Sequence, residues 1–202
     1  FAAVLDLYDH RFRDLGSPLV QAVPDLYIDV QNAASMLFRL ELRGIEVGGR
    51  WVELADKAEA RIGDCLSAFT LPHWMMALAA DGRWRAADRL LGAIDAAAAA
   101  APEDHAALLR DAALPICRAV LAHRRGDHAG AVAAMRPALD IMHRLGGSHA
   151  QQDVLQQLFL DAALRADLAD DARLLLDRVA RRHPASLEHR LAYADAARQL
   201  LH

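Results

Sequence analysis

Three features of the sequence predict an all-α fold, in which antiparallel helix pairs stack into a right-handed superhelix, an α-solenoid. Residues with high helix propensity dominate throughout, and no segment alternates apolar and polar residues as a strand does. In the long segments, apolar residues recur every three or four positions. A short phrase also returns three times at spacings of 44 and 41 residues, and internal repeats of this period are typical of stacked helix pairs.

The recurring phrase has a small or turn-forming residue at its centre and an apolar residue four positions before it. Alanine follows five positions after the centre, and a large apolar residue follows nine positions after it. The three copies are Leu78, Gly82, Ala87, Leu91; Ala122, Gly126, Ala131, Met135; and Ala163, Asp167, Ala172, Leu176. Each copy therefore predicts a helix, a tight turn at the central residue, and a second helix that packs back on the first.

Before the first repeat, the sequence predicts three helices. A first segment from Ala3 to Arg13 ends at stop signals that include Pro18. Pro24 and Asp25 then begin a strongly periodic helix that ends near Gly44. Its apolar stripe consists of Val30, Ala33, Leu37 and Leu40. After a two-glycine turn, a further helix begins at about residue 50.

The repeats predict three helix pairs, with short connections that favour antiparallel neighbours. The first pair comprises residues 72–80 and 84–101, the second 108–125 and 128–145, and the third 148–166 and 170–183. A last amphipathic helix, Leu187 to Leu201, covers the apolar end of the stack. Three tryptophans lie on or beside the apolar stripes and are interpreted as core residues: Trp51, Trp74 and Trp84.

Composition limits the function classes. Of the 202 residues, 54% are hydrophobic and 25% are charged, which is typical of a folded chain rather than a disordered one. The net charge of -4 gives no basic surface for nucleic acid, and no apolar run approaches the roughly 20 residues that cross a bilayer. Cys65 and Cys117 are isolated, which indicates a reducing, cytoplasmic compartment. We find no nucleophile motif and no phosphate-binding loop, so we expect no catalytic residue, bound metal or cofactor.

The hinge phrase resembles the tetratricopeptide repeat, which places glycine at the turn between its helices, alanine five positions later and a bulky apolar residue nine positions later. Pro184 stands seventeen positions after the third hinge, where that repeat usually has proline. The spacing of the copies exceeds the usual period of about 34 residues. Met75 and Leu160 also replace a small residue of the repeat. The resemblance therefore implies divergent repeats with long helices.

Two longer runs resemble a more specific family, the tetratricopeptide repeat protein 38 family. They are Asp29 to Leu42, with Val47, Gly48, Arg50 and Trp51 after it, and Gly146 to Asp153. In the second run, that family has arginine where this chain has Gln152. The resemblance extends from Asp25 to about Pro184 and corresponds to the C-terminal half of such proteins. It implies that residues 1–202 form a single helical domain, the C-terminal part of a longer protein, and it implies no particular activity.

The run from Gly146 to Asp153 is a candidate site with two interpretations. Ser148 and Gln151 have the spacing of a capping box, which is a structural role at the start of a helix. The same helix start could bind an anion with its free backbone N–H groups, and His149 and Asp153 would share one helical face. Their spacing also suits a metal or a general base, but zinc requires a third protein ligand, and only the distant His73 is available.

A polar stripe opposite the apolar stripe of the helix after Pro24 contains Asp29, Asn32, Ser35 and Arg39. In a helical repeat protein, such a stripe either faces solvent or lines the concave groove, where amide and guanidinium groups bind a carboxylate or a peptide backbone. His73 follows Pro72 at the start of a short helix, where it is either a packed or a functional histidine.

We expect a binding scaffold that holds a peptide, a protein partner or a small polar ligand in its concave groove. The expected lining consists of Asp29, Asn32, Arg39, His73, Ser148, His149, Gln151 and Asp153. One alternative is an enzyme with a pocket at the same place and His73 or His149 as general base. Another is self-association of the chain into a homo-oligomer through the apolar end near Phe1 and Leu5.

Overall fold

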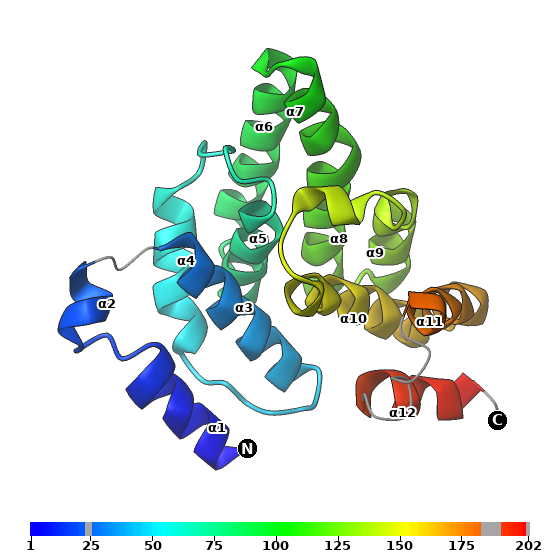
Figure 1. Ribbon diagram of the computed structural model, residues 1–202, viewed down its shortest axis with the longest axis horizontal. Helices are drawn as coiled ribbons and strands as arrows, with labels where there is room; N and C mark the ends of the chain where they lie inside the picture. Colours follow the sequence, from blue (N-terminus) through cyan, green and yellow to red (C-terminus); the bar gives the residue numbers. More distant parts are fainter. Residues whose placement is uncertain (23–25, 183–190, 201–202) are drawn as a thin grey trace.

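The structure of the chain is a computed structural model, which describes residues 1–22, 26–182 and 191–200. Every regular element in these residues is helical, so the predicted all-α class is confirmed. Figure 1 shows α1 (Ala2–Leu7) and α2 (Pro18–Ala22) at one end of the molecule and α11 (Ala169–Arg182) and α12 (Leu191–Leu200) near the other. The buried apolar side chains between them form one continuous core.

Two of the helices that precede the repeats lie in the positions that the apolar stripes predict. They are α3 (Tyr27–Glu41) and α4 (Arg50–Ala60). The stripe of α3 is buried, since Ala33 and Leu37 have no exposed surface and Val30 has 2%. Burial of this stripe drives the helix onto the core, because each buried aliphatic side chain contributes about 1.5–3 kcal/mol.

Each copy of the recurring phrase forms a helical hairpin. The first hairpin consists of α5 (Thr70–Ala80) and α6 (Trp84–Ala100), the second of α8 (Leu114–Arg124) and α9 (His128–Met135), and the third of α10 (His149–Arg165) and α11. The two helices of each hairpin pack against each other.

The central residue of each phrase has a left-handed backbone conformation. The φ angles are +69° at Gly82, +79° at Gly126 and +56° at Asp167, which is the one residue other than glycine with positive φ in the described chain. The next N–H donates to the carbonyl of the first residue of the phrase, as in a Schellman motif. These bonds are Arg83 to Leu78 at 2.9 Å, Asp127 to Ala122 at 3.0 Å and Leu168 to Ala163 at 2.9 Å. The three turns are therefore the same structure, and aspartate tolerates the left-handed region better than most residues do.

The alanine five positions after each hinge lies where the two helices of the hairpin meet. Ala87, Ala131 and Ala172 all have no exposed surface. Each N–H donates to the carbonyl four residues earlier and so belongs to the first turn of the second helix. A larger side chain at this position would have to displace the first helix of the pair.

The first helix of the second hairpin is longer than its sequence pattern predicts and contains a π turn. The helix begins as α7 (Glu103–Leu108), widens over Leu109–Ala113 and continues as α8. Pro115 lacks an N–H, and its ring would clash with the carbonyl of Asp111 in a regular α-helix. The wider turn accommodates both effects within one continuous helix.

The second helix of this hairpin is shorter than predicted. The predicted helix 128–145 ends at Met135 and gives way to two short 3-10 turns, Arg136–Ala138 and Met142–Leu145. The reason is Pro137, which cannot donate to Ala133 and which crowds the preceding turn. The sequence contained this signal, and the prediction of one long helix was wrong.

Three further expectations need correction or lie outside the described residues. The stop signal at Pro18 instead begins α2, since proline is well accepted in a first helical turn. Trp84 is 40% exposed and is not a core residue, whereas Trp51 and Trp74 are buried. Pro24, Asp25 and Pro184 lie outside the described residues, as do both ends of the predicted last helix 187–201.

The first helices of successive pairs pack against one another in chain order, α3 on α5, α5 on α8 and α8 on α10. In addition, α10 packs against α3, which precedes the first hairpin. Figure 1 shows α10 running past the ends of α5 and α8 toward α3. This contact brings the start of α10 beside the polar stripe of α3, more than a hundred residues away in the chain.

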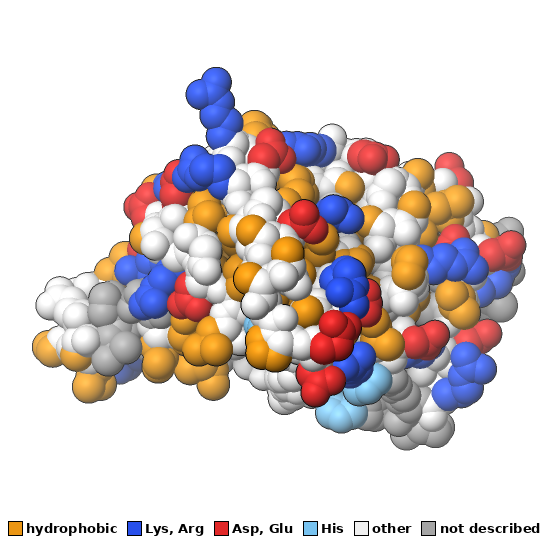
Figure 2. All heavy atoms as spheres, turned by 90° about the horizontal axis from the view of Figure 1, so that it is seen from above, with side chains coloured by type: hydrophobic (Ala, Val, Ile, Leu, Met, Phe, Trp, Pro, Cys, Tyr) orange, Lys and Arg blue, Asp and Glu red, His pale blue; other side chains and the backbone are white. Residues whose placement is uncertain are grey.

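On the face shown in Figure 2, acidic and basic side chains are interspersed. Large apolar side chains are exposed mainly on the N-terminal segment, including Phe1, Leu7, Leu15 and Leu19. None of the described helices has the length and apolarity that crossing a bilayer requires.

Ala131→Leu tests the packing of the hairpins. The added side chain enters a contact where Ala131 has no exposed surface, so we expect a loss of about 1–3 kcal/mol in the free energy of unfolding. Ala129→Leu is the matched control, since Ala129 is an exposed residue of the same helix. Urea unfolding of both variants measures the difference. An equal stability of the two variants would show that the hairpin contact is misassigned.

Candidate functional site

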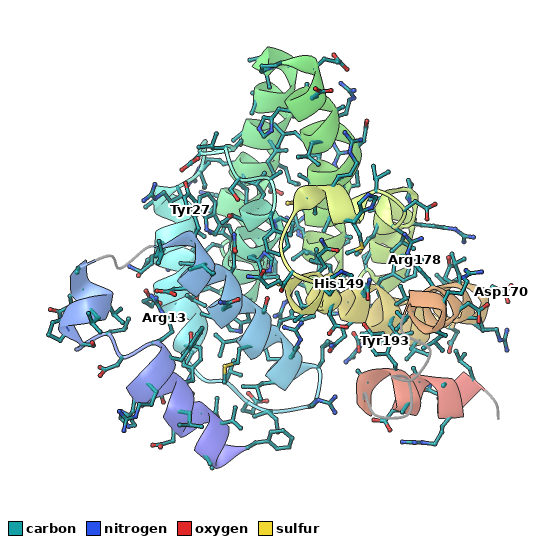
Figure 3. All side chains as sticks on the ribbon, in the orientation of Figure 1. Arg13, Tyr27, His149, Asp170, Arg178 and Tyr193 are labelled. Carbon is teal, nitrogen blue, oxygen red and sulfur yellow. The ribbon has the colours of Figure 1, made fainter. Side chains whose placement is uncertain are left out.

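The polar stripe of α3 and the start of α10 together form a groove. Its volume is about 450 Å³, and its lining comes from these two helices alone. The lining residues are Asn32, Ser35, Met36, Arg39, Ala150, Gln151 and Asp153. Figure 3 shows the start of α10, marked by His149, facing the blue-to-cyan helices of the N-terminal half. Four of the eight residues predicted as lining therefore meet here: Asn32, Arg39, Gln151 and Asp153.

Arg39 joins the two walls of the groove. Its guanidinium donates to the carbonyl oxygen of Ala150 at 2.7 Å and lies 3.4 Å from a carboxylate oxygen of Asp153. It also donates to the carbonyl of Ser35 in its own helix, at 3.3 Å. The Arg39 side chain is 28% exposed, so part of the guanidinium remains open to the groove.

Asp153 is the acidic counterpart of Arg39 and is largely buried. One carboxylate oxygen accepts from the Tyr193 hydroxyl of α12 at 2.6 Å, and the other accepts from Gln157 at 2.5 Å. Tyr193 lies below α10 in Figure 3. No sequence pattern indicated this tyrosine, because forty residues separate it from Asp153 and only the packing of α12 brings it there.

The helix α10 begins with the predicted capping box. The Gln151 N–H donates to the Ser148 hydroxyl at 3.3 Å, and the Ser148 N–H donates to the Gln151 side-chain oxygen at 2.9 Å. The Gln151 side-chain nitrogen also donates to the side-chain oxygen of Asn32 at 3.2 Å. Gln151 thus closes the cap and binds α3 at the same time, so the structural and the site interpretations hold together.

Gly147 brings the start of α10 close to α5. A Cβ atom at this position would lie 2.6 Å from the ring of Phe69, and the φ angle is +79°. Only glycine satisfies both conditions. The unusual two-glycine run therefore has a packing reason, and it places the cap of α10 over the start of α5.

Among the groove residues, Ser35 has a buried side-chain polar atom that lacks a partner in the described chain. The residue is 4% exposed, and its hydroxyl oxygen makes no hydrogen bond in the described chain. A buried hydroxyl without a partner costs about 1–3 kcal/mol, which a ligand or a water in the groove would recover.

His73 does not line the groove. It has no exposed surface, its Nδ1 lies 2.9 Å from the carbonyl oxygen of Phe69, and its ring packs on the Phe69 ring. Burial lowers the pKa of His73 from 6.5 to about 4, against an opposing effect of the Phe69 hydrogen bond. The imidazole is therefore neutral at pH 7, with Nδ1 protonated to donate to Phe69.

The other predicted lining residues lie at the margin. Asp29 is a half-buried residue in the first turn of α3, outside the groove lining. Ser148 and His149 are exposed at the start of α10, also outside the lining. Within the described residues, no three histidine, cysteine or acidic side chains gather closely enough to hold a metal ion.

Both cysteines are buried and unpaired. Burial raises the pKa of the Cys117 thiol far above its usual value, with a smaller contribution from Cys65. Because the thiolate is the reactive form, Cys117 is chemically inert in the folded chain.

No family model matches this chain, and no solved structure matches it with significance.

Ser148→Ala tests the capping box. We expect a loss of about 1 kcal/mol in the free energy of unfolding, because the Gln151 N–H loses its acceptor. Ser148→Asp retains an acceptor and should keep the parent stability. Urea unfolding measures both variants. Full stability of Ser148→Ala would contradict the capping role.

The buried His73 predicts a pH dependence of stability. The unfolded chain binds a proton at His73 near pH 6.5, whereas the folded chain binds it only near pH 4. Between these values, unfolding takes up a proton, so the free energy of unfolding falls as the pH drops through this window. The loss amounts to about 3 kcal/mol at pH 4.

Denaturant unfolding of the parent and of His73→Leu, from pH 7 to pH 4, isolates this contribution. The difference between the two stabilities should shrink or reverse as the pH falls, since leucine does not titrate. Parallel curves would show that His73 takes up its proton equally in the folded and the unfolded chain.

Proposed function

We propose that this chain is a binding scaffold that holds a carboxylate, the C-terminus of a peptide or a small acid, in the groove between α3 and α10. The observation that carries the proposal is a groove in which side-chain donors of α3 face the N-terminus of α10, a helix that is distant in sequence. The partner is accordingly a peptide, a protein tail or a small polar molecule.

The donors suit a carboxylate. Arg39 has five N–H groups. Its contacts with Ser35, Ala150 and Asp153 do not use all of them, so some N–H groups of the guanidinium can donate to a ligand. The Asn32 amide uses its oxygen to accept from Gln151, which leaves its two N–H groups for a ligand. The unpartnered Ser35 hydroxyl adds a third donor.

The helix start adds a favourable field. The N-terminus of α10 carries a partial positive charge and free backbone N–H groups, both of which favour an anion. Asp153 opposes an anion, but it is bound by Tyr193, Gln157 and Arg39 and is mostly buried. The open part of the groove therefore presents more donors than acceptors.

The proposed architecture is a divergent tetratricopeptide-like α-solenoid, and the proposed relationship is to the tetratricopeptide repeat protein 38 family. Three identical left-handed hinges at Gly82, Gly126 and Asp167 support it, as does the packing of each first helix on the next. The unpaired buried cysteines fit a cytoplasmic location.

The enzyme alternative has less support. A general base must reach the substrate, and His73 is completely buried beside Phe69. His149 lies outside the groove lining, and the groove is an open depression rather than a closed pocket. We therefore assign binding rather than catalysis to this groove.

The test is a titration of the purified chain with a mixture of random tetrapeptides, in a free-acid form and in an amidated form. NMR shifts of backbone amides in α3 and α10 report binding. We expect saturable shifts with the free acids, and affinity at least about tenfold weaker for the amides or for Arg39→Gln, since a charge-assisted pair contributes about 1.5–3 kcal/mol. Arg110→Gln is the control, because Arg110 is an exposed arginine far from the groove.

Two results would contradict the proposal. Equal binding of free and amidated peptides would exclude carboxylate recognition. No binding, with a mass in solution that rises with concentration, would favour self-association through the apolar N-terminal segment. A circular dichroism spectrum and melting temperature of Arg39→Gln close to the parent values ensure that the variant is folded.

A further inference from the structure

A second depression lies where the last turn of α3 meets α8, α9 and α10. Its volume is about 210 Å³, and it shares no residue with the groove. Its lining consists of Phe38, Glu41, Leu42, His123, Arg124, His128 and Arg165. Two histidines and two arginines from three helices thus meet in a space of the size of a small ion.

An aspartate orients the first histidine. The Nε2 atom of His123 lies 2.7 Å from a carboxylate oxygen of Asp161, and the His123 side chain is only 10% exposed. The same oxygen accepts from Arg165 at 2.8 Å. Burial alone would raise the pKa of Asp161, but the hydrogen bonds from His123 and Arg165 outweigh it and lower the pKa. Asp161 is therefore ionised and fixes the Nε2 proton of His123.

Three buried nitrogen atoms around this depression have no hydrogen-bond partner. They are Nδ1 of His123, Nε of Arg124 and Nδ1 of His128. Each unpartnered buried group costs about 1–3 kcal/mol, and such groups are few in native proteins. Their concentration on three neighbouring side chains indicates an occupant that hydrogen-bonds to all of them.

Charged side chains of both signs surround the depression: Arg124 and Arg165 are basic, and Glu41, Asp161 and Asp127 are acidic. The last turn of α3 supplies Glu41, which accepts from Arg124 at 2.5 Å. Helix α10 supplies Asp161 and Arg165. Helix α9 supplies His128, whose ring packs edge-on against the His123 ring with 5.2 Å between the ring centroids. The pKa of His128 is lowered mainly by burial, and further by His123 and Arg165. Asp127, at the start of α9, raises the pKa of His128 slightly.

We propose that this depression binds a phosphate group, as inorganic phosphate or a small phosphate monoester, and that His123 takes up a proton when the group binds. Protonation places an N–H at Nδ1 of His123, beside the Nε–H of Arg124 and the His128 ring. These donors come from different directions, which suits a tetrahedral oxyanion better than a planar carboxylate. The carboxylate of Asp161 is bonded to Nε2 of His123, on the other side of the ring from Nδ1, and it stabilises the positive charge of the protonated ring.

The three nitrogen atoms are shielded from solvent, so binding requires a side chain at the mouth to turn. His128 is half-buried, as His123 and Arg124 are, and it stands in the first turn of α9, so its ring is the side chain that we propose to turn. The volume is large enough for one phosphate group.

Sulfate and inorganic phosphate are the probes, with phosphoserine as a monoester. Sulfate keeps its charge between pH 6 and pH 8, so any pH dependence of its binding comes from the protein. Imidazole ¹⁵N shifts of His123 report binding and protonation together. We expect saturable shifts with sulfate and phosphate and a sulfate affinity at least tenfold higher at pH 6 than at pH 8. Stronger binding of phosphoserine than of phosphate would identify the monoester as the natural source.

Two variants and two controls sharpen the test. Asp161→Asn should weaken sulfate binding at pH 6 about tenfold and reduce its pH dependence, whereas a merely structural role would leave both unchanged in a folded variant. His123→Gln should abolish the pH dependence. His143→Gln, at an exposed histidine, should match the parent. Arg39→Gln should also match it, so that a failure of the carboxylate groove and a failure of this site are distinguishable.

Three outcomes would overturn the proposal. Sulfate shifts that do not saturate, or that appear equally at His143, would indicate weak surface binding only. Sulfate binding independent of pH would exclude proton uptake by His123. Saturable binding of Zn²⁺ with loss of the His123 and His128 signals, and no response to sulfate, would assign the nitrogen atoms to a metal instead.

Discussion

The left-handed backbone at three hinge residues is the constraint on which the packing of this protein depends. A helix that ends in this conformation reverses within a few residues, and its last carbonyls are bonded by the following N–H groups. The alanine five positions later then enters the space between the two helices. Because Gly82, Gly126 and Asp167 impose the same reversal, the first helices of successive pairs lie side by side and can build a common inner face.

The contact of α10 with α3 brings polar residues of distant helices together in the groove and in the second depression. The residues at 32, 35, 36 and 39 of α3 line the groove with the start of α10, whereas residues 38, 41 and 42, at the end of α3, line the second depression with Arg165 at the end of α10. On α10, Asp153 and Asp161 stand about two turns apart and serve one site each. A change that separates the two helices would therefore affect both sites.

The sequence predicted the hinges and the polar stripe because both depend on short-range spacing. It also predicted that Arg39 and Asp153 belong to one site, since both fall at polar positions of helices that line an inner face. It did not predict Tyr193 or the second depression, because these depend on how distant helices pack. His73 could not be placed either, since a histidine beside Phe69 is buried or exposed according to the helix that covers it. Pro115 and Pro137 were local signals that the helix predictions overlooked.

Both sites place a basic side chain next to a carboxylate of α10, and this arrangement favours binding over a purely structural role. A structural ion pair is best when each partner satisfies the other, because every unpaired buried group costs free energy. Here each carboxylate accepts at least two hydrogen bonds, whereas donors on Arg39 and nitrogen atoms on His123 and Arg124 remain without partners. The aspartates hold these groups in place before a ligand arrives, which reduces the ordering cost of binding. The incomplete bonding therefore points to anions as the missing partners.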